Sequence, residues 1–112
     1  MAYDEQLAKR VRACIGPHPA LTEQKMFGGL AFLLGGNMAC GIVGTDLMVR
    51  TGPARYADAL AQPHARPMEF TGRSMKGMVF VAPEGLEGAA LPAWVEVGAS
   101  FAGGLPAKLG KR

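Results

Sequence analysis

Acid–base chemistry near neutral pH most often depends on histidine, and this sequence offers little context for it. The two histidines, His18 and His64, both stand in proline-flanked loops outside any catalytic motif. The patterns Gly-x-Ser-x-Gly, His-Glu-x-x-His and Cys-x-x-Cys do not occur in the sequence. Since catalysis needs a base beside a nucleophile and usually a third, orienting group, we predict no enzymatic activity.

Phosphate and metal sites are also weakly indicated. Gly28-Gly29 lacks the lysine and hydroxyl of a phosphate-binding loop and falls at the start of a strand, where glycine more often marks a close backbone approach. Cys14 and His18 are separated by Gly16-Pro17, so they cannot share a helix face. The seven methionines are scattered without a repeat, which favours core packing over soft-metal binding. We therefore expect no cofactor.

The formal net charge of +3 first suggests a nucleic-acid partner. However, Lys108, Lys111 and Arg112 lie within the last five residues, and without them nine basic side chains balance nine acidic ones. The excess belongs to the tail, which argues against direct nucleic-acid binding. A fold could still gather further basic residues into one patch, and these are Arg50, Arg55, Arg66, Arg73 and Lys76.

The length of 112 residues predicts a single domain over residues 1–105, followed by a basic flexible tail at 106–112. No apolar run approaches the length of a membrane span, and the first ten residues carry early acids and no apolar signal core. We therefore expect a cytoplasmic protein without a membrane partner. Two cysteines are too few for a disulfide framework, so Cys14 and Cys40 are predicted to be small core residues.

The stretch 26–50 consists mostly of apolar residues and glycine, and it predicts three short strands joined by two tight turns. A three-residue loop at 35–37 places every large residue on one face, whereas a two-residue loop mixes large and small residues. The predicted pairs are Leu34 with Met38, Phe32 with Cys40, and Leu30 with Ile42. The opposite face then receives Gly29, Ala31, Leu33, Ala39, Gly41 and Val43.

The second turn of this stretch is predicted to be a two-residue loop at Thr45-Asp46. This choice puts Leu47 and Val49 on the large-residue face and sends Arg50 outward. A three-residue loop would reverse the faces and direct the charge of Arg50 into the core.

Helical periodicity predicts three helices. The first begins after Asp4 as N-cap and ends at Gly16-Pro17. Its expected buried stripe is Leu7, Val11, Cys14 and Ile15. The second starts at Gly52-Pro53 and ends before Pro63. The last starts at Pro92, and its stripe, expected to pack on the sheet, is Trp94, Val97, Phe101 and Leu105.

Residues 18–22 and 62–67 are predicted to be connectors, and residues 68–70 and 76–81 to be strands on either side of a turn at 71–74. The resulting order is α-β-β-β-α-β-β-α. Strands joined by tight turns are antiparallel neighbours, so we predict an α+β two-layer sandwich in which helices pack on an antiparallel sheet.

Outside the core, the turn at 71–74 and the strand after it have the residues that most suggest an interaction site. Arg73 and Lys76 place two cations around an exposed turn beside Met75. Together with Arg50, these residues form the predicted interaction surface, which suits a protein or acidic partner. A polar hairpin loop without a partner is the alternative interpretation.

Several segments, in order along nearly the whole chain, resemble the N-terminal domain family of TfoX, also called Sxy, the bacterial competence regulators. The first carries the motif Met26, Phe27, Gly28 and Gly29, preceded by Lys25 and followed by Phe32. Then come Gly36-Asn37-Met38, the segment 47–50, the strand 73–81, and the closing helix with Trp94. The chain is similar to a stand-alone, single-domain member of the family.

The resemblance implies a secretion-chaperone-like α+β fold and no known enzymatic activity. It also implies that longer members, which carry a second C-terminal domain, act as transcriptional co-activators with the cyclic-AMP receptor protein. The leading hypothesis is therefore a regulatory or protein-interaction module, with the transcription machinery as candidate partner and a homodimer as a further option. The alternative is a ligand-binding or enzymatic domain that uses the small-residue sheet face around Gly29, Ala31, Ala39 and Gly41.

Overall fold

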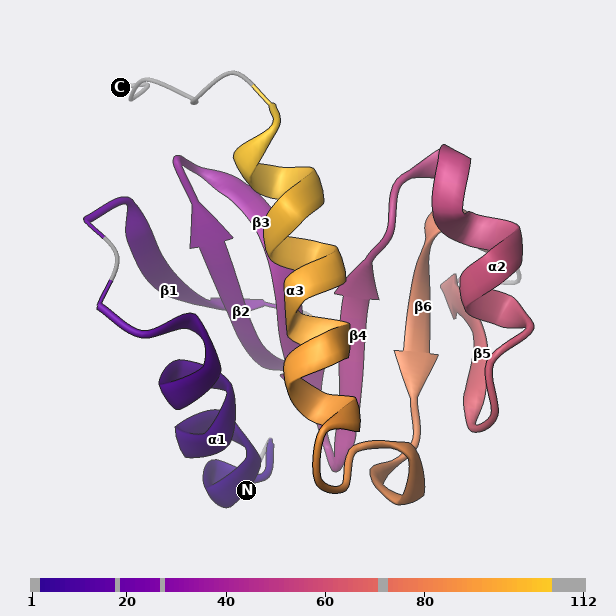
Figure 1. Cartoon of the computed structure of the whole chain (residues 1–112), viewed down its shortest axis with the longest axis horizontal. Helices are drawn as coiled ribbons and strands as arrows, with labels where there is room; N and C mark the ends of the chain where they lie inside the picture. The colour runs from indigo at the N-terminus through magenta and orange to yellow at the C-terminus, as the bar shows by residue number, and fades with distance from the viewer. Residues whose placement is uncertain (1–2, 18, 27, 71–72, 106–112) are drawn as a thin grey trace.

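The computed structural model describes residues 3–17, 19–26, 28–70 and 73–105, with the backbone alone for residues 26, 68–70 and 73–76. One six-stranded antiparallel sheet has the order β1-β2-β3-β4-β6-β5. Helices α1 (Glu5–Ile15), α2 (Tyr56–Leu60) and α3 (Ala90–Gly103) contribute to one core on the same face of it (Figure 1). The strands are β1 (Leu21–Met26), β2 (Gly29–Leu34), β3 (Asn37–Val43), β4 (Asp46–Arg50), β5 (Ala65–Phe70) and β6 (Arg73–Val81).

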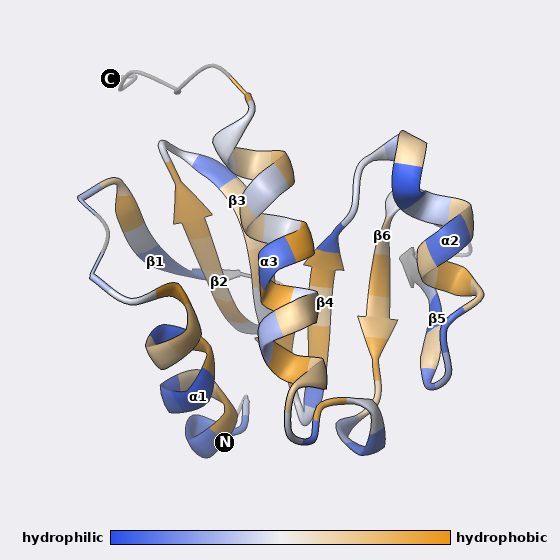
Figure 2. Cartoon of the chain, viewed as in Figure 1, coloured by the Kyte–Doolittle hydropathy of each residue, from blue (hydrophilic) through white to orange (hydrophobic). Residues whose placement is uncertain are grey.

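This architecture confirms the predicted α+β class, and the predicted elements follow in their predicted order. It adds one strand, β1, because Leu21 and Thr22 begin a strand rather than ending a connector. β1 lies at an edge of the sheet, and its residues 22–25 are polar and exposed. An edge strand of this kind lacks the apolar alternation that identifies a strand in sequence. Figure 2 shows the contrast with the hydrophobic strands β2, β4 and β6.

The other edge strand, β5, is also longer than predicted, since it starts at Ala65 and includes Pro67. Proline has no N–H to donate to a neighbouring strand, which a central strand requires at every position. An edge strand tolerates proline where its N–H would face away from the sheet. The predicted turn at 71–74 is shorter, because Glu69 pairs with Ser74 and Phe70 with Arg73. Residues 71 and 72 of that turn lie outside the described residues.

The β2–β3 hairpin has most of the predicted faces but a different turn and register. Phe32 pairs with Cys40 and Leu30 with Ile42, as predicted, but Leu34 pairs with Asn37 and not with Met38. The turn is Gly35-Gly36, with φ of 60° and 81°, and a bulge follows it. Such a turn requires two residues in the left-handed region, and the bulge restores the register toward the core.

That bulge exchanges two neighbouring residues between the faces. Ala39 is fully buried in a cluster with Leu34 and Ala102 of α3. Met38 instead clusters with Met48 and Phe80 on the opposite face. Both placements reverse the prediction, because one extra residue in β3 shifts every side chain before it to the other side.

The β3–β4 hairpin confirms the predicted faces with a different loop. The turn residues are Gly44-Thr45, so Val43 pairs with Asp46 and Ile42 with Leu47. This register differs from the predicted one by two residues, and a shift of two leaves every side chain on the same face. Leu47 and Val49 are therefore fully buried in the core under the helices, as predicted.

Helix α1 buries a slightly different face from the predicted one. Asp4 caps the helix, accepting hydrogen bonds from the Gln6 and Leu7 backbone N–H groups. Leu7, Ala8 and Val11 are buried, whereas Cys14 is exposed near the end of the helix. The prediction that Cys14 is a core residue is therefore wrong, while Cys40 is fully buried as predicted.

Helix α3 begins at Ala90, and its orientation differs from the prediction in a way that defines the site. The residues buried against the sheet side are Leu91, Val95, Gly98 and Ala102, together with Trp94. Val97 and Phe101 are only partly buried. A Cβ atom added at Gly98 would lie 2.9 Å from the Ala39 carbonyl carbon. The helix thus turns Gly98 and Ala102 to the sheet, and at Gly98 the backbones of α3 and β3 approach closely.

Candidate functional site

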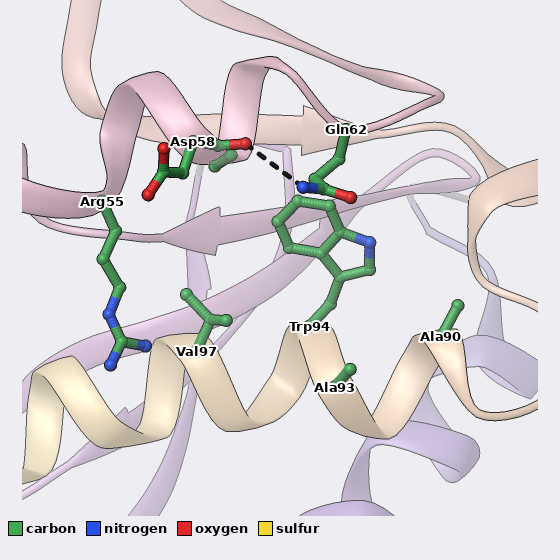
Figure 3. Close-up of a pocket in the computed structure, with 8 residues that line it drawn as sticks. Arg55, Asp58, Gln62, Ala90, Ala93, Trp94 and Val97 are labelled. Atoms are coloured by element: carbon green, nitrogen blue, oxygen red, sulfur yellow. Dashed lines mark hydrogen bonds between the residues drawn. The ribbon is translucent and has the colours of Figure 1, made fainter.

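Helices α2 and α3 lie side by side on the sheet and enclose a groove of about 380 Å³ between them. One wall comes from α3, and the other from the short segment that contains α2 (Figure 3). The lining residues are Arg55, Asp58, Ala59, Gln62, Ala90, Ala93, Trp94 and Val97.

The α3 wall is the apolar stripe that faces away from the sheet. Ala90, Ala93 and Val97 follow one another at spacings of three and four residues, so they share one side of the helix. Trp94 is 8% exposed and belongs to the core cluster. In Figure 3 its indole stands between the two walls, with Gln62 above it. The groove therefore has small side chains on one wall and an aromatic floor.

The α2 wall is set by the chain turn that follows β4. Gly52 has φ of 79°, and Pro53 then opens the 3₁₀ turn Pro53–Arg55 that leads into α2. Ala59 is 6% exposed and anchors α2 on the core. Arg55, Asp58 and Gln62 are spaced three and four residues apart, and all three line the groove. The Gln62 side-chain amide donates a hydrogen bond to the Asp58 backbone carbonyl at 3.5 Å.

Two residues of opposite charge, Arg55 and Asp58, line the α2 wall of the groove. A second hollow of about 370 Å³ adjoins it and shares Arg55. Phe101 of α3 lines this hollow, and the guanidinium of Arg50 lies 5.1 Å from the centre of its ring. Neither arginine forms an ion pair with a carboxylate within the part of the chain that the structure describes.

The residues predicted as an interaction surface are placed as follows. Arg50 is partly buried at the end of β4, with its guanidinium over Phe101. Arg73, Met75 and Lys76 lie in β6, and their side chains are outside the described residues. The sequence did not identify the groove residues Asp58, Gln62, Ala90 and Ala93. The signal available for the last two was their spacing with Val97.

The predicted motif residues lie in and around the hairpins. Met26 ends β1 and is described in its backbone alone, and Phe27 lies outside the described residues. Gly28 is in the turn, and a Cβ at Gly29 would lie 3.1 Å from the Val43 Cα. Asn37 is buried at 4% exposure and pairs with Leu34. Gly29 thus stands at a close approach of two strands.

The residues of the predicted small-residue face do not all lie on the same side of the sheet. The carbonyl group of Ala39 lies against Gly98 of α3, on the helix side of the sheet. A Cβ at Gly41 would lie 2.8 Å from the Leu30 carbonyl oxygen, and Ala31 is fully buried. Ala39 is therefore separated from the others, and the hollows described above involve none of these residues.

The titratable groups are dispersed over the fold. Desolvation raises the pKa of the buried Cys40 thiol to about 12, which suppresses its thiolate. His64 is exposed with φ of 69°, and His18 lies outside the described residues. Where side chains are described, His, Cys, Asp and Glu form no group of three or more that could hold a metal.

Among the described basic residues, Arg66 has interaction partners of its own. The guanidinium of Arg66 pairs with Asp46 at 2.6 Å and lies 5.0 Å from the centre of the Phe80 ring. Among the described helices, none is long and apolar enough to cross a membrane.

Fold and groove together define a small α+β domain with one helical layer on an antiparallel sheet and a groove between two helices. The family model of the TfoX N-terminal domain matches residues 13–102. The chain therefore belongs to the TfoX N-terminal domain family. This match runs from α1 to the last turns of α3 and includes every residue that lines the groove. The comparisons with curated proteins and with solved structures gave no match.

Proposed function

We propose that this domain is a non-enzymatic regulatory module that acts by binding another protein, and that the partner docks in the α2–α3 groove. The observation that carries the proposal is the second apolar side of α3. Ala90, Ala93 and Val97 remain exposed or half-buried beside Trp94, although the helix already buries another face against the sheet. Contiguous apolar surface of this kind, bordered by polar residues, is typical of protein-binding sites.

Family membership supports the regulatory part of the proposal. The partner that we expect is a component of the transcription machinery in the cytoplasm. Direct nucleic-acid binding is not part of the proposal, because the basic excess lies in residues 106–112.

A site-specific cross-linking experiment tests this function. A photoreactive amino acid is placed at Gln62, on the rim of the groove, and as a control at Ala57, which is exposed on α2 but does not line the groove. On irradiation in bacterial cells, we expect one discrete adduct from position 62 and none from position 57. Mass spectrometry should identify a transcription-related protein in the adduct.

Two further variants locate the contact. Ala93→Arg fills the groove from the α3 wall with a long charged side chain, and it should abolish the adduct formed at position 62. Arg73→Ala/Lys76→Ala asks whether the β5–β6 hairpin also contributes, in which case the adduct weakens. An adduct that persists in Ala93→Arg would contradict docking in the groove.

A further inference from the structure

The two edges of the sheet differ in how well they are protected against pairing with a further strand. β5 contains Pro67, and a bulge interrupts its register between Pro67 and Glu69. Proline and bulges are features by which edge strands avoid such pairing. β1 has neither, since all of its residues pair with β2 in one continuous register. The open side of β1 is therefore a regular strand edge.

Every second residue of β1 directs its backbone groups to this open side. The Gly35 N–H donates a hydrogen bond to the Ala20 carbonyl at 3.0 Å, so the carbonyl of Ala20 faces β2. Hydrogen-bonded and non-hydrogen-bonded positions alternate along an antiparallel strand. The N–H and C=O groups of Leu21, Glu23 and Lys25 therefore point away from β2, toward the edge of the sheet, where no described strand pairs with them. These groups can bind a further strand.

The charges on β1 decide which strand can pair there. Glu23 and Lys25 are both exposed. They pair with core residues of β2, so their side chains lie on the helix side of the sheet. Arg12 of α1 donates two hydrogen bonds to the Glu23 carboxylate, at 2.7 and 2.9 Å, and holds it over that side. An acidic and a basic side chain thus stand two residues apart, both at positions whose backbone faces outward.

A second copy of the chain carries the complementary pattern. If two β1 strands pair antiparallel about a two-fold axis, outward-facing residues must meet outward-facing residues. An axis at Glu23 or at Lys25 sets that residue opposite itself, so like charges meet. An axis at Thr22 leaves Lys25 without an opposing residue in β1. Only an axis at Gln24 sets Glu23 of each copy opposite Lys25 of the other, which gives two pairs of opposite charge.

We propose that two copies of the chain associate through β1, antiparallel about an axis at Gln24, so that their sheets become one continuous sheet. Glu23 and Lys25 then form the hydrogen-bonded pairs across the axis, and each pair exchanges two backbone hydrogen bonds. The contact is short, so the dimer is weak, with a Kd on the order of 10–100 µM. β1 and α2 lie at opposite ends of the sheet, so the α2–α3 groove stays open in the dimer (Figure 1).

Complementary charge variants test the proposal by sedimentation equilibrium of the full chain at about 5–500 µM. Lys25→Glu makes both pairs acidic and Glu23→Lys makes both basic, so each variant alone should associate about tenfold more weakly or worse. Mixed in equal amounts, the two variants should regain the wild-type Kd within about threefold, because each pair again joins a basic and an acidic residue. Glu84→Lys makes the same charge change at an exposed position of the turn Pro83–Gly85 and should leave the Kd within about twofold.

A cysteine at the axis reads the register directly. The background is Cys14→Ser, which removes the exposed native thiol. Gln24→Cys places two cysteines opposite each other in a non-hydrogen-bonded pair, with Cα atoms about 4.5 Å apart, a separation that a disulfide can span. The oxidant diamide should therefore link the two copies. Thr22→Cys, at an equally exposed position, should give no link, because its two copies lie four residues apart along the strands, roughly 13 Å.

Three results would overturn the proposal. The first is a wild type that remains monomeric at about 500 µM. The second is a mixture of Lys25→Glu and Glu23→Lys that associates no better than either variant alone, or a dimer that neither variant weakens. The third is a cross-link from Thr22→Cys in place of Gln24→Cys, since it would move the axis. None of these results affects cross-linking from position 62, which tests the groove separately.

Discussion

The close approach of α3 to the sheet makes Gly98→Ala the most informative single change for the fold. The added Cβ would lie 2.9 Å from the Ala39 carbonyl carbon and closer still to its oxygen, and both atoms belong to the backbone. Backbone atoms in a paired strand cannot rotate away as a flexible side chain does. Ordinary contacts begin at 3.4 Å, so α3 must withdraw by on the order of 1 Å along the whole line of contact.

The expected cost follows from two opposing effects. Overpacking of a core usually costs about 1–3 kcal/mol, and the upper part of that range applies where the backbone must move. Alanine regains about 1 kcal/mol of helix propensity over glycine. We therefore expect a net loss of about 2 kcal/mol in the free energy of unfolding, or roughly 8–16 °C in Tm for a domain near this size.

A glycine on the same helix provides the control. Gly103 has no atom within 4 Å of an added Cβ, and it is exposed. Gly103→Ala should leave stability unchanged or raise it by up to about 1 kcal/mol. Urea unfolding followed by Trp94 fluorescence measures both variants. If Gly98→Ala is within about 0.5 kcal/mol of the wild type, the argument that small residues set the distance of α3 from the sheet is wrong.

Three further predictions concern titratable groups. A thiol reagent at pH 8 should modify the exposed Cys14 and leave Cys40 unreacted until the protein unfolds. Because burial raises the pKa of Cys40 from its ordinary 9.0 to about 12, the folded state holds this proton longer, and Cys40 lowers stability as pH rises from 9 to 12. Cys40→Ala should flatten the pH dependence of urea unfolding there; an unchanged slope would contradict the assignment. Arg12 donates two hydrogen bonds to the Glu23 carboxylate and holds its pKa below the ordinary 4.5. Glu23→Gln should therefore destabilise by about 0.5 kcal/mol at neutral pH, since the pair is largely exposed. That difference should vanish as pH falls through the lowered pKa, and its persistence at acid pH would refute the pairing.

Much of the sheet could be predicted from sequence because strand periodicity constrains it strongly. The faces of Leu30, Phe32, Cys40, Ile42 and Leu47 were predicted correctly although both loops were wrong. In the first hairpin, a bulge offset the error in loop length. In the second, the predicted register was wrong by two residues, and such a shift leaves each side chain on the same face. What alternation cannot reveal is an exposed polar edge strand, and β1 was missed for that reason.

The groove between α2 and α3 could not be predicted from the sequence. Its walls come from segments around residues 55–62 and 90–97, which are far apart in the chain. Arg55 was visible as a basic residue, but nothing local showed that it lines a groove. Conversely, the predicted interaction residues Arg73, Met75 and Lys76 remain a prediction, because their side chains lie outside the described residues.

By itself, the sequence determined the α+β class and the faces of most residues in β2, β3 and β4, since both depend on local periodicity. Only the tertiary structure decided the rotation of α3. That helix is apolar around most of its circumference, with Glu96 as its one charged residue, so hydrophobicity alone gives it no unique buried face. Gly98 decides which face of α3 is buried, because the face that contains it can approach the Ala39 backbone most closely and therefore packs on the sheet. The larger side chains Trp94, Val97 and Phe101 are thereby turned toward the groove and its adjoining hollow.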